Sequence, residues 1–285
     1  MSILQAAFLG LVQGLAEFLP ISSSGHLNLI QALFGLNLEH QLLFNILLHV
    51  GSLIAVIAVF WKDWIAMILH PIRNHTLGLL ILASLPALAA KLLFGDQLDW
   101  LETHNGLLGV SFLFTGLLLL LTQWISSRRD PATVTDTVRA PHALAMGAMQ
   151  VVGMLPGISR SGSTLFGGVA SKLDRQAAAK FSFMMSMPAI VASFLSEGYS
   201  AYKAGAFSQS GDWAAILMGM VVAGVSGYLA IRYMLRVITR ISLNWFALYV
   251  ILLGIAVIVL QATGVIADAP AAAQPAAQAM TALLG

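Results

Sequence analysis

Two short stretches of the chain gather side chains that can do chemistry. The first, QGLAEFLPISSSGH (13–26), contains one carboxylate, three consecutive hydroxyl groups and one imidazole. Such a set can provide a nucleophile together with the base that takes its proton. The candidate residues in this stretch are Gln13, Glu17, Ser22, Ser23, Ser24 and His26.

The second stretch, PGISRSGST (156–164), places one arginine among serines, a threonine and glycines. A guanidinium binds phosphate oxygens in pairs, hydroxyl groups donate to the same oxygens, and backbone N–H groups are free where a helix begins. We expect that helix to begin near Thr164 and the stretch to bind a phosphate group. The candidate residues here are Ser159, Arg160, Ser161, Gly162 and Thr164.

A further pair, Asn45 and His49, is spaced by one helical turn in an apolar segment. Both side chains can then face one cavity and bind substrate. A histidine that is hydrogen-bonded inside a helix bundle would show the same spacing, so the pattern leaves both interpretations open.

The elements that hold these residues are expected to be membrane helices. Of the 285 residues, 59% are hydrophobic and 9% charged, more apolar surface than one water-soluble core could bury. The net charge of +2 comes from basic residues scattered through short loops, so we exclude nucleic-acid binding. The absence of cysteine excludes disulfides, thiolate nucleophiles and cysteine-ligated metals.

Six apolar segments are long enough to cross a bilayer, which takes about 20 residues. They are 41–61, 77–94, 106–125, 180–200, 212–234 and 244–264. Two more apolar segments, 1–35 and 142–171, are broken midway by the two polar stretches. Backbone groups freed at such breaks need partners in protein or water, so we expect two re-entrant helix-loop-helix hairpins.

Basic residues in the loops set the orientation of the spans. The loops expected on the cytoplasmic side carry Lys62, Arg73, Arg128, Arg129, Arg139, Lys172, Arg175, Lys180, Arg232, Arg236 and Arg240. The loops after the second and fourth spans are acidic or nearly neutral and are expected outside. The first hairpin then enters from the outer side and the second from the inner side.

The two halves of the chain resemble each other. With a shift of 137 positions, identical residues align at Gly10, Gln13, Ile21, Ser22, Ser24, Gly25 and Phe44. Three spans separate the copies, so their orientations are opposite, as in the inverted repeats of many transporters. We predict an all-α polytopic membrane protein with one domain, 1–264, made of repeats at about 1–125 and 142–264, and a flexible Ala/Pro-rich tail at 265–285.

The two polar stretches together resemble the paired motifs of bacterial undecaprenyl-diphosphate phosphatases, the bacitracin-resistance family, and the similar layout covers the chain before its tail. The resemblance implies a multi-pass enzyme of the bacterial inner (plasma) membrane. It would convert undecaprenyl diphosphate to undecaprenyl phosphate, the lipid carrier for peptidoglycan and other cell-wall polymers. It also implies an active site facing the periplasm, a homodimer, and dependence on a divalent cation, Mg²⁺ or Ca²⁺.

Carried over to this sequence, the resemblance gives catalytic roles to Glu17, Ser23, His26 and Arg160, and phosphate binding to Ser159, Ser161 and Thr164. Either Ser23 attacks the terminal phosphorus with His26 or Glu17 as base, or His26 is the nucleophile, or water attacks directly. Gln13 and Asn45 stand where some relatives have acids. These changes leave Glu17 as the expected ligand of a cation that bridges to the diphosphate.

Two other functions fit parts of the sequence. The type-2 phosphatidic-acid phosphatases have an SR-x5-H-x3-D motif, and this chain has Phe166 and Ala170 where that motif needs His and Asp, so we exclude them. A secondary transporter or lipid flippase for an anionic, phosphorylated substrate fits the repeat, with Arg160 binding the head group and Glu17 carrying a proton. It explains the hydroxyl and imidazole cluster less well than hydrolysis does.

Overall fold

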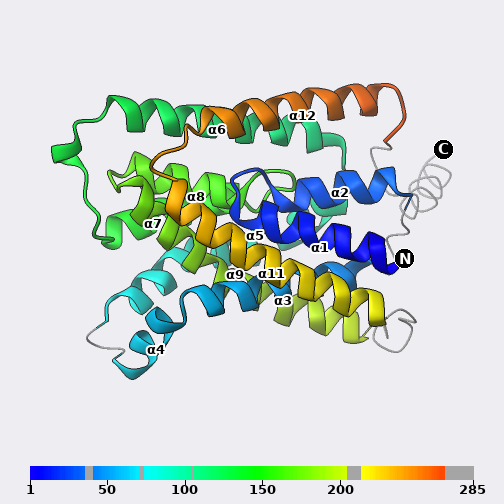
Figure 1. Cartoon of the computed structure of the whole chain (residues 1–285), viewed down its shortest axis with the longest axis horizontal. Helices are drawn as coiled ribbons and strands as arrows, with labels where there is room; N and C mark the ends of the chain where they lie inside the picture. The colour runs from blue at the N-terminus through cyan, green and yellow to red at the C-terminus, as the bar shows by residue number, and fades with distance from the viewer. Residues whose placement is uncertain (36–40, 71–73, 104, 204–212, 267–285) are drawn as a thin grey trace.

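The computed structural model describes residues 1–35, 41–70, 74–103, 105–203 and 213–266. Within these ranges the chain is almost entirely helical (Figure 1), and the one strand-like feature is a bridge between Thr135 and Leu173. The prediction of an all-α protein is confirmed for this part of the chain. Most of the predicted tail, 267–285, lies outside the described residues.

Five of the described helices are long and apolar enough to cross a membrane. They are α5 (Thr76–Thr103), α6 (Leu108–Arg128), α9 (Arg175–Lys203), α11 (Trp213–Val237) and α12 (Asn244–Ala262). A sixth candidate is the pair α3 (Gln41–Val59) and α4 (Trp61–Leu69), which is bent by 74°. The expectation of six spans therefore agrees with the upper count, and the protein is a multi-pass membrane protein by helix length and composition.

Four shorter helices form two pairs. α1 (Ile3–Phe18) packs on α2 (Ser23–Leu33), and α7 (Ala140–Val152) packs on α8 (Arg160–Ala170). With 16 residues or fewer, each is shorter than the roughly 20 residues that cross a bilayer. In Figure 1, α1 and α2 lie toward the end that holds the N-terminus, and α7 and α8 lie toward the opposite end.

The first break, between α1 and α2, follows from a proline and a serine. The residue before Pro20 is disfavoured in a helix, and Leu19 is accordingly extended, with ψ 142°. α2 begins directly after Ser22, whose side chain accepts a hydrogen bond from the N–H of Gly25 at 3.3 Å. Ser22 has φ 72°, a conformation that strains a residue with a β-carbon. The strained serine directly precedes Ser23.

The second break, between α7 and α8, depends on a glycine. Gly157 has φ 81°, and a β-carbon there would lie 2.8 Å from a side chain of α6. α8 is capped by Ser159, whose side chain accepts from the backbone N–H three residues on at 3.1 Å. The prediction that this helix begins near Thr164 is therefore wrong: it begins at Arg160, because Ser159 provides the cap.

Small residues allow the helices of the two pairs to approach their neighbours closely. α1 packs along α11, and α7 packs along α5. A β-carbon on Gly14 of α1 would lie 2.3 Å from the carbonyl oxygen of Ala223 in α11, nearer than any packed structure allows. Glycine at such a position lets two membrane helices meet backbone to backbone.

We expect Gly14→Ala to destabilise the protein by about 1–3 kcal/mol, since α1 and α11 must move apart. Gly78→Ala is the matched control, because nothing lies within 4 Å of a β-carbon there and the position is helical. Its expected effect is a gain of about 0.5–1 kcal/mol. Thermal unfolding of both variants in detergent checks this, and equal melting temperatures would contradict the close packing of α1 on α11.

Candidate active site

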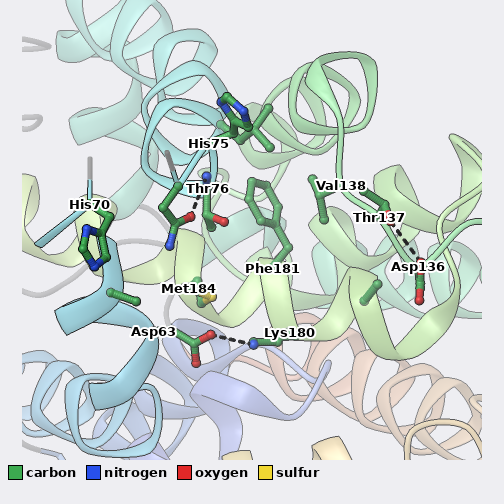
Figure 2. A pocket seen from close by; sticks show the side chains of 14 residues that line it. Asp63, His70, His75, Thr76, Asp136, Thr137, Val138, Lys180, Phe181 and Met184 are labelled. Atoms are coloured by element: carbon green, nitrogen blue, oxygen red, sulfur yellow. Dashed lines mark hydrogen bonds and ion pairs between the residues drawn. The ribbon is translucent and has the colours of Figure 1, made fainter. Parts of the chain in front are cut away.

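Two of the cavities among the described residues are similar in size. One, of about 580 Å³, is lined by residues of α4, α5, α9 and the segment 136–138 (Figure 2), and it contains the ion pair between Lys180 Nζ and Asp63 Oδ1 at 2.8 Å. None of the predicted site residues lines it. The other, of about 560 Å³, lies where the two breaks meet, and eight of the thirteen predicted residues line it: Glu17, Ser22, Ser23, Ser24, His49, Ser159, Arg160 and Ser161.

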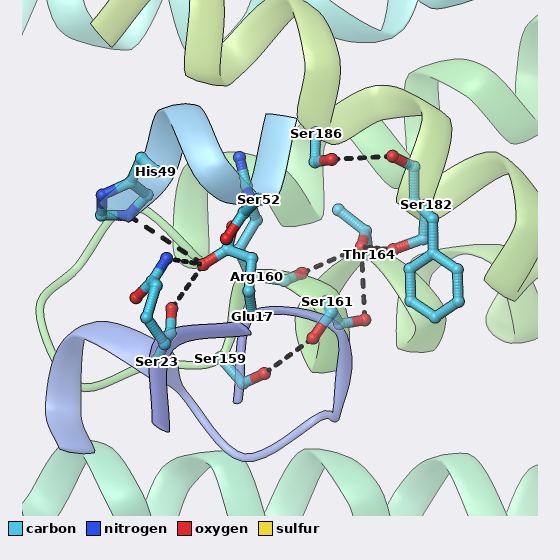
Figure 3. A network of polar contacts seen from close by, with 12 residues as sticks. Glu17, Ser23, His49, Ser52, Ser159, Arg160, Ser161, Thr164, Ser182 and Ser186 are labelled. Atoms are coloured by element: carbon cyan, nitrogen blue, oxygen red, sulfur yellow. Dashed lines mark hydrogen bonds and ion pairs between the residues drawn. The ribbon is translucent and has the colours of Figure 1, made fainter. Parts of the chain in front are cut away.

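Glu17 lines this second cavity and lies at the centre of a network of polar contacts (Figure 3). It lies in the last turn of α1, and its side chain is only 4% exposed. Its Oε1 forms an ion pair with Arg160 at the start of α8. Its Oε2 accepts hydrogen bonds from Ser23 Oγ at 2.5 Å and Gln13 Nε2 at 3.1 Å, and His49 Nε2 lies 3.9 Å away. One buried carboxylate therefore joins both broken segments.

This arrangement can supply a nucleophile, a base and a phosphate-binding group. The Ser23 hydroxyl donates to a carboxylate, which is the geometry of a nucleophile with its base. Arg160 uses one N–H on Glu17, and a guanidinium has further N–H groups that can bind phosphate oxygens. Both side chains line the same cavity, so a phosphorus atom held by the arginine would lie near the serine.

Hydroxyl groups fix the start of α8 against its surroundings. The backbone N–H of Ser159 donates to Thr115 Oγ1 of α6 at 3.0 Å. Ser161 Oγ donates to the carbonyl oxygen of Leu19, in the first break, at 3.1 Å, and lies 3.2 Å from Ser159 Oγ. These contacts join the two breaks and attach the start of α8 to α6.

Three of the predicted residues do not line the cavity and instead make polar contacts with other parts of the protein. Thr164 Oγ1 lies 2.6 Å from Ser182 Oγ, where both side chains are buried between α8 and α9. Gly162 donates its N–H to the Ser159 cap. Asn45 Oδ1 accepts a hydrogen bond from Gln31 Nε2 at 2.9 Å, which joins α3 to α2.

His26 also lies outside the cavity lining. Its Nδ1 is 2.7 Å from the carbonyl oxygen of Ser22, and its Nε2 is 2.7 Å from the hydroxyl of Tyr249 in α12. The ring stacks on Tyr249 and meets Phe112 edge-on. With both ring nitrogens engaged, His26 holds the first turn of α2 in place, and the structure does not bring it into contact with Glu17.

The structure adds cavity residues that the sequence analysis did not select. Among them are Ser84 and Lys91 of α5, Gln150 of α7, and Ser193 and Glu197 of α9. A charge inside an apolar span was the available signal for Lys91, and alignment with a residue of the first motif was the signal for Gln150. The other three became recognisable only when α5 and α9 were placed beside the breaks.

The described residues offer few ligands for a metal ion. They contain no group of three or more His, Asp or Glu side chains arranged around one point. Glu17 and His49 are the pair in this cavity. Mg²⁺ is often held by one or two carboxylates together with phosphate oxygens of the substrate. The residues therefore fit a cation that binds together with a phosphorylated substrate.

Comparison with known proteins identifies the family. Residues 6–256 match the family described as bacitracin resistance protein BacA. The chain belongs to this family. The match includes both breaks and every residue of the cavity described above, so the resemblance inferred from the two motifs is confirmed over most of the chain.

Several curated proteins are similar to this chain over nearly their full length. The undecaprenyl-diphosphatase of Carboxydothermus hydrogenoformans is 39% identical over 264 residues, which cover 93% of this chain and 99% of the relative. That of Halothermothrix orenii is 37% identical, over 91% and 98% of the two chains. Undecaprenyl-diphosphatase 3 of Bacillus cereus is 37% identical, over 93% and 100%.

Proposed function

We propose that this protein hydrolyses undecaprenyl diphosphate to undecaprenyl phosphate and inorganic phosphate, and so regenerates the lipid carrier for cell-wall polymers. The observation that carries the proposal is the contact of Glu17 with both Ser23 and Arg160 in one cavity. It joins a base, a hydroxyl nucleophile and a phosphate-binding cation. The names of the relatives support the choice of substrate.

In the proposed mechanism, Ser23 Oγ attacks the terminal phosphorus while Glu17 takes the serine proton. The bond from that phosphorus to the bridging oxygen breaks, and undecaprenyl phosphate leaves with the electron pair and receives the proton. Water then hydrolyses the phosphoserine with Glu17 as base. Arg160 and Ser161 neutralise charge on the phosphoryl oxygens during both steps.

We propose that the protein uses a divalent cation, Mg²⁺ or Ca²⁺. Glu17 would hold this cation, and the cation would neutralise charge on the diphosphate. His49, 3.9 Å from the carboxylate, is the nearest second donor. The Arg160 ion pair occupies the other carboxylate oxygen. The protein's own contribution to cation binding is thus small without substrate.

We also propose an inverted repeat in the bacterial inner membrane, with the two short helix pairs as re-entrant hairpins. A shift of 137 residues carries the bounds of α2 onto those of α8 and the start of α5 onto the start of α11. The aligned Gly10 and Gly147 each approach a backbone carbonyl in the opposite half, at Gly219 and Ala83. Loop charges support a periplasm-facing cavity, and the family resemblance supports a homodimer.

Purified protein in detergent should release one phosphate from each molecule of undecaprenyl diphosphate or of a shorter isoprenoid diphosphate, and leave the monophosphate. A chelator should stop the reaction, and Mg²⁺ or Ca²⁺ should restore it. Isoprenoid monophosphate is the control substrate, because it has no anhydride bond. If folded protein releases no phosphate with any divalent cation, the transporter or flippase hypothesis replaces this one.

A further inference from the structure

One wall of the active-site cavity comes from neither motif. α5 contributes Ser84, Leu88 and Lys91, and α9 contributes Ala189, Ser193 and Glu197. Within each helix these residues recur every three or four positions, so they lie along one face. Seven residues separate Ser84 from Lys91, a rise of roughly 10 Å. The cavity therefore extends from the Glu17–Arg160 pair along these two helices.

The cavity lining contains two basic and two acidic side chains. Among the described residues that line it, Arg160 and Lys91 are the cations and Glu17 and Glu197 are the acids. Glu197 accepts a hydrogen bond from Ser193, one helical turn earlier. A diphosphate adds at least two negative charges to this balanced set. Arg160 and the proposed divalent cation lie with Glu17 at one phosphate, and the second phosphate can bind a further basic side chain of the same cavity.

Lys91 is placed to be that basic side chain. Side chains on an α-helix lean toward its N-terminus, so the lysine leans back along α5 toward the turn of Leu88 and Ser84. Its side chain is half-buried at the cavity. Leu88, one turn earlier, is 52% exposed, so apolar surface adjoins the ammonium group. A phosphate held there could keep its isoprenoid chain against the apolar outside of α5.

We propose that Lys91 binds the phosphate that stays on the lipid, while Arg160 binds the phosphate that is removed. This inference rests on the proposed hydrolysis, and it makes Lys91 a binding residue that selects a lipid diphosphate by its second charge. An ammonium group suits this position because it is a compact charge with three donors. The same contact would hold the product, an isoprenoid monophosphate, before it leaves.

Lys91→Met tests the proposal, with Lys91→Gln as a second uncharged variant. Both should raise the KM for an isoprenoid diphosphate about tenfold and change kcat by less than about threefold, because a contact made equally in substrate and transition state affects KM alone. Inhibition by isoprenoid monophosphate should weaken by a similar factor, while inhibition by inorganic phosphate should stay unchanged. Lys91→Arg should recover most of the affinity.

Lys180→Met is the control, because it removes a lysine that lines the other cavity. Unchanged KM and unchanged monophosphate inhibition in Lys91→Met and Lys91→Gln would overturn the proposal. So would an equal loss of inhibition by inorganic phosphate, which would place Lys91 at the terminal phosphate. Direct binding of isoprenoid monophosphate to the same variants tests Lys91 even if the wild-type protein hydrolyses nothing, so the two proposals can fail separately.

Discussion

Replacing Arg160 with alanine should lower kcat/KM for an isoprenoid diphosphate by about a thousandfold or more. Arginines that neutralise the phosphoryl group in the transition state of its transfer raise the rate by a factor on the order of 10³–10⁵. The same change should also destabilise the fold, because it leaves the buried Glu17 carboxylate without its cation. Breaking a buried ion pair from one side typically costs about 3–5 kcal/mol.

Two further variants separate the chemical effect from the structural one. Arg160→Lys keeps the charge but loses the paired N–H groups, so it should keep most of the stability and lose activity about 10- to 100-fold. The double variant E17Q/R160A leaves no unpaired charge, so its melting temperature should rise above that of Arg160→Ala while hydrolysis stays absent. Phosphate release and thermal unfolding in detergent measure both properties. Arg160→Ala with near wild-type turnover would contradict the assigned role.

The sequence was sufficient to predict the helix breaks where a local rule determines the backbone conformation. Pro20 must end a helix, and a serine that follows it can cap the next one, so the first break was predictable. The second break was also predicted, but the helix that follows it was expected to begin near Thr164. The structure shows that Ser159 caps α8, which puts Arg160 in its first turn beside Glu17.

The sequence was not sufficient to predict the contacts of a side chain that has two possible partners. His26 lies in the motif beside the candidate nucleophile, yet its ring lies between Tyr249 and Phe112, which are far from it in the chain. His49 and Asn45 looked equivalent by spacing, and only His49 approaches Glu17. The α5–α9 wall depends on how two spans pack, which no local pattern specifies.

Replacing Ser23 with alanine should abolish hydrolysis, with a loss of about 10⁴-fold or more, because an enzyme that loses its nucleophile retains little beyond binding and charge stabilisation. The reason is geometric: Ser23 Oγ lies 2.5 Å from Glu17 Oε2. Ser24→Ala is the matched control in the same first turn of α2, since Ser24 also lines the cavity, while the hydrogen bond to Glu17 comes from Ser23. Its expected loss is less than about tenfold, as for a lost binding hydroxyl.

The covalent intermediate separates the mechanisms that the sequence left open. Acid-quenched wild-type protein should carry a phosphoryl group on Ser23, located by mass spectrometry, and His26→Gln should still form it. The reason is that both nitrogens of the His26 ring are engaged, by the Ser22 carbonyl and the Tyr249 hydroxyl, so neither is free to attack phosphorus. A phosphohistidine at position 26 would instead make His26 the nucleophile in place of Ser23. No covalent species, together with activity in Ser23→Ala, would require direct attack by water, with Glu17 taking its proton in place of the serine's.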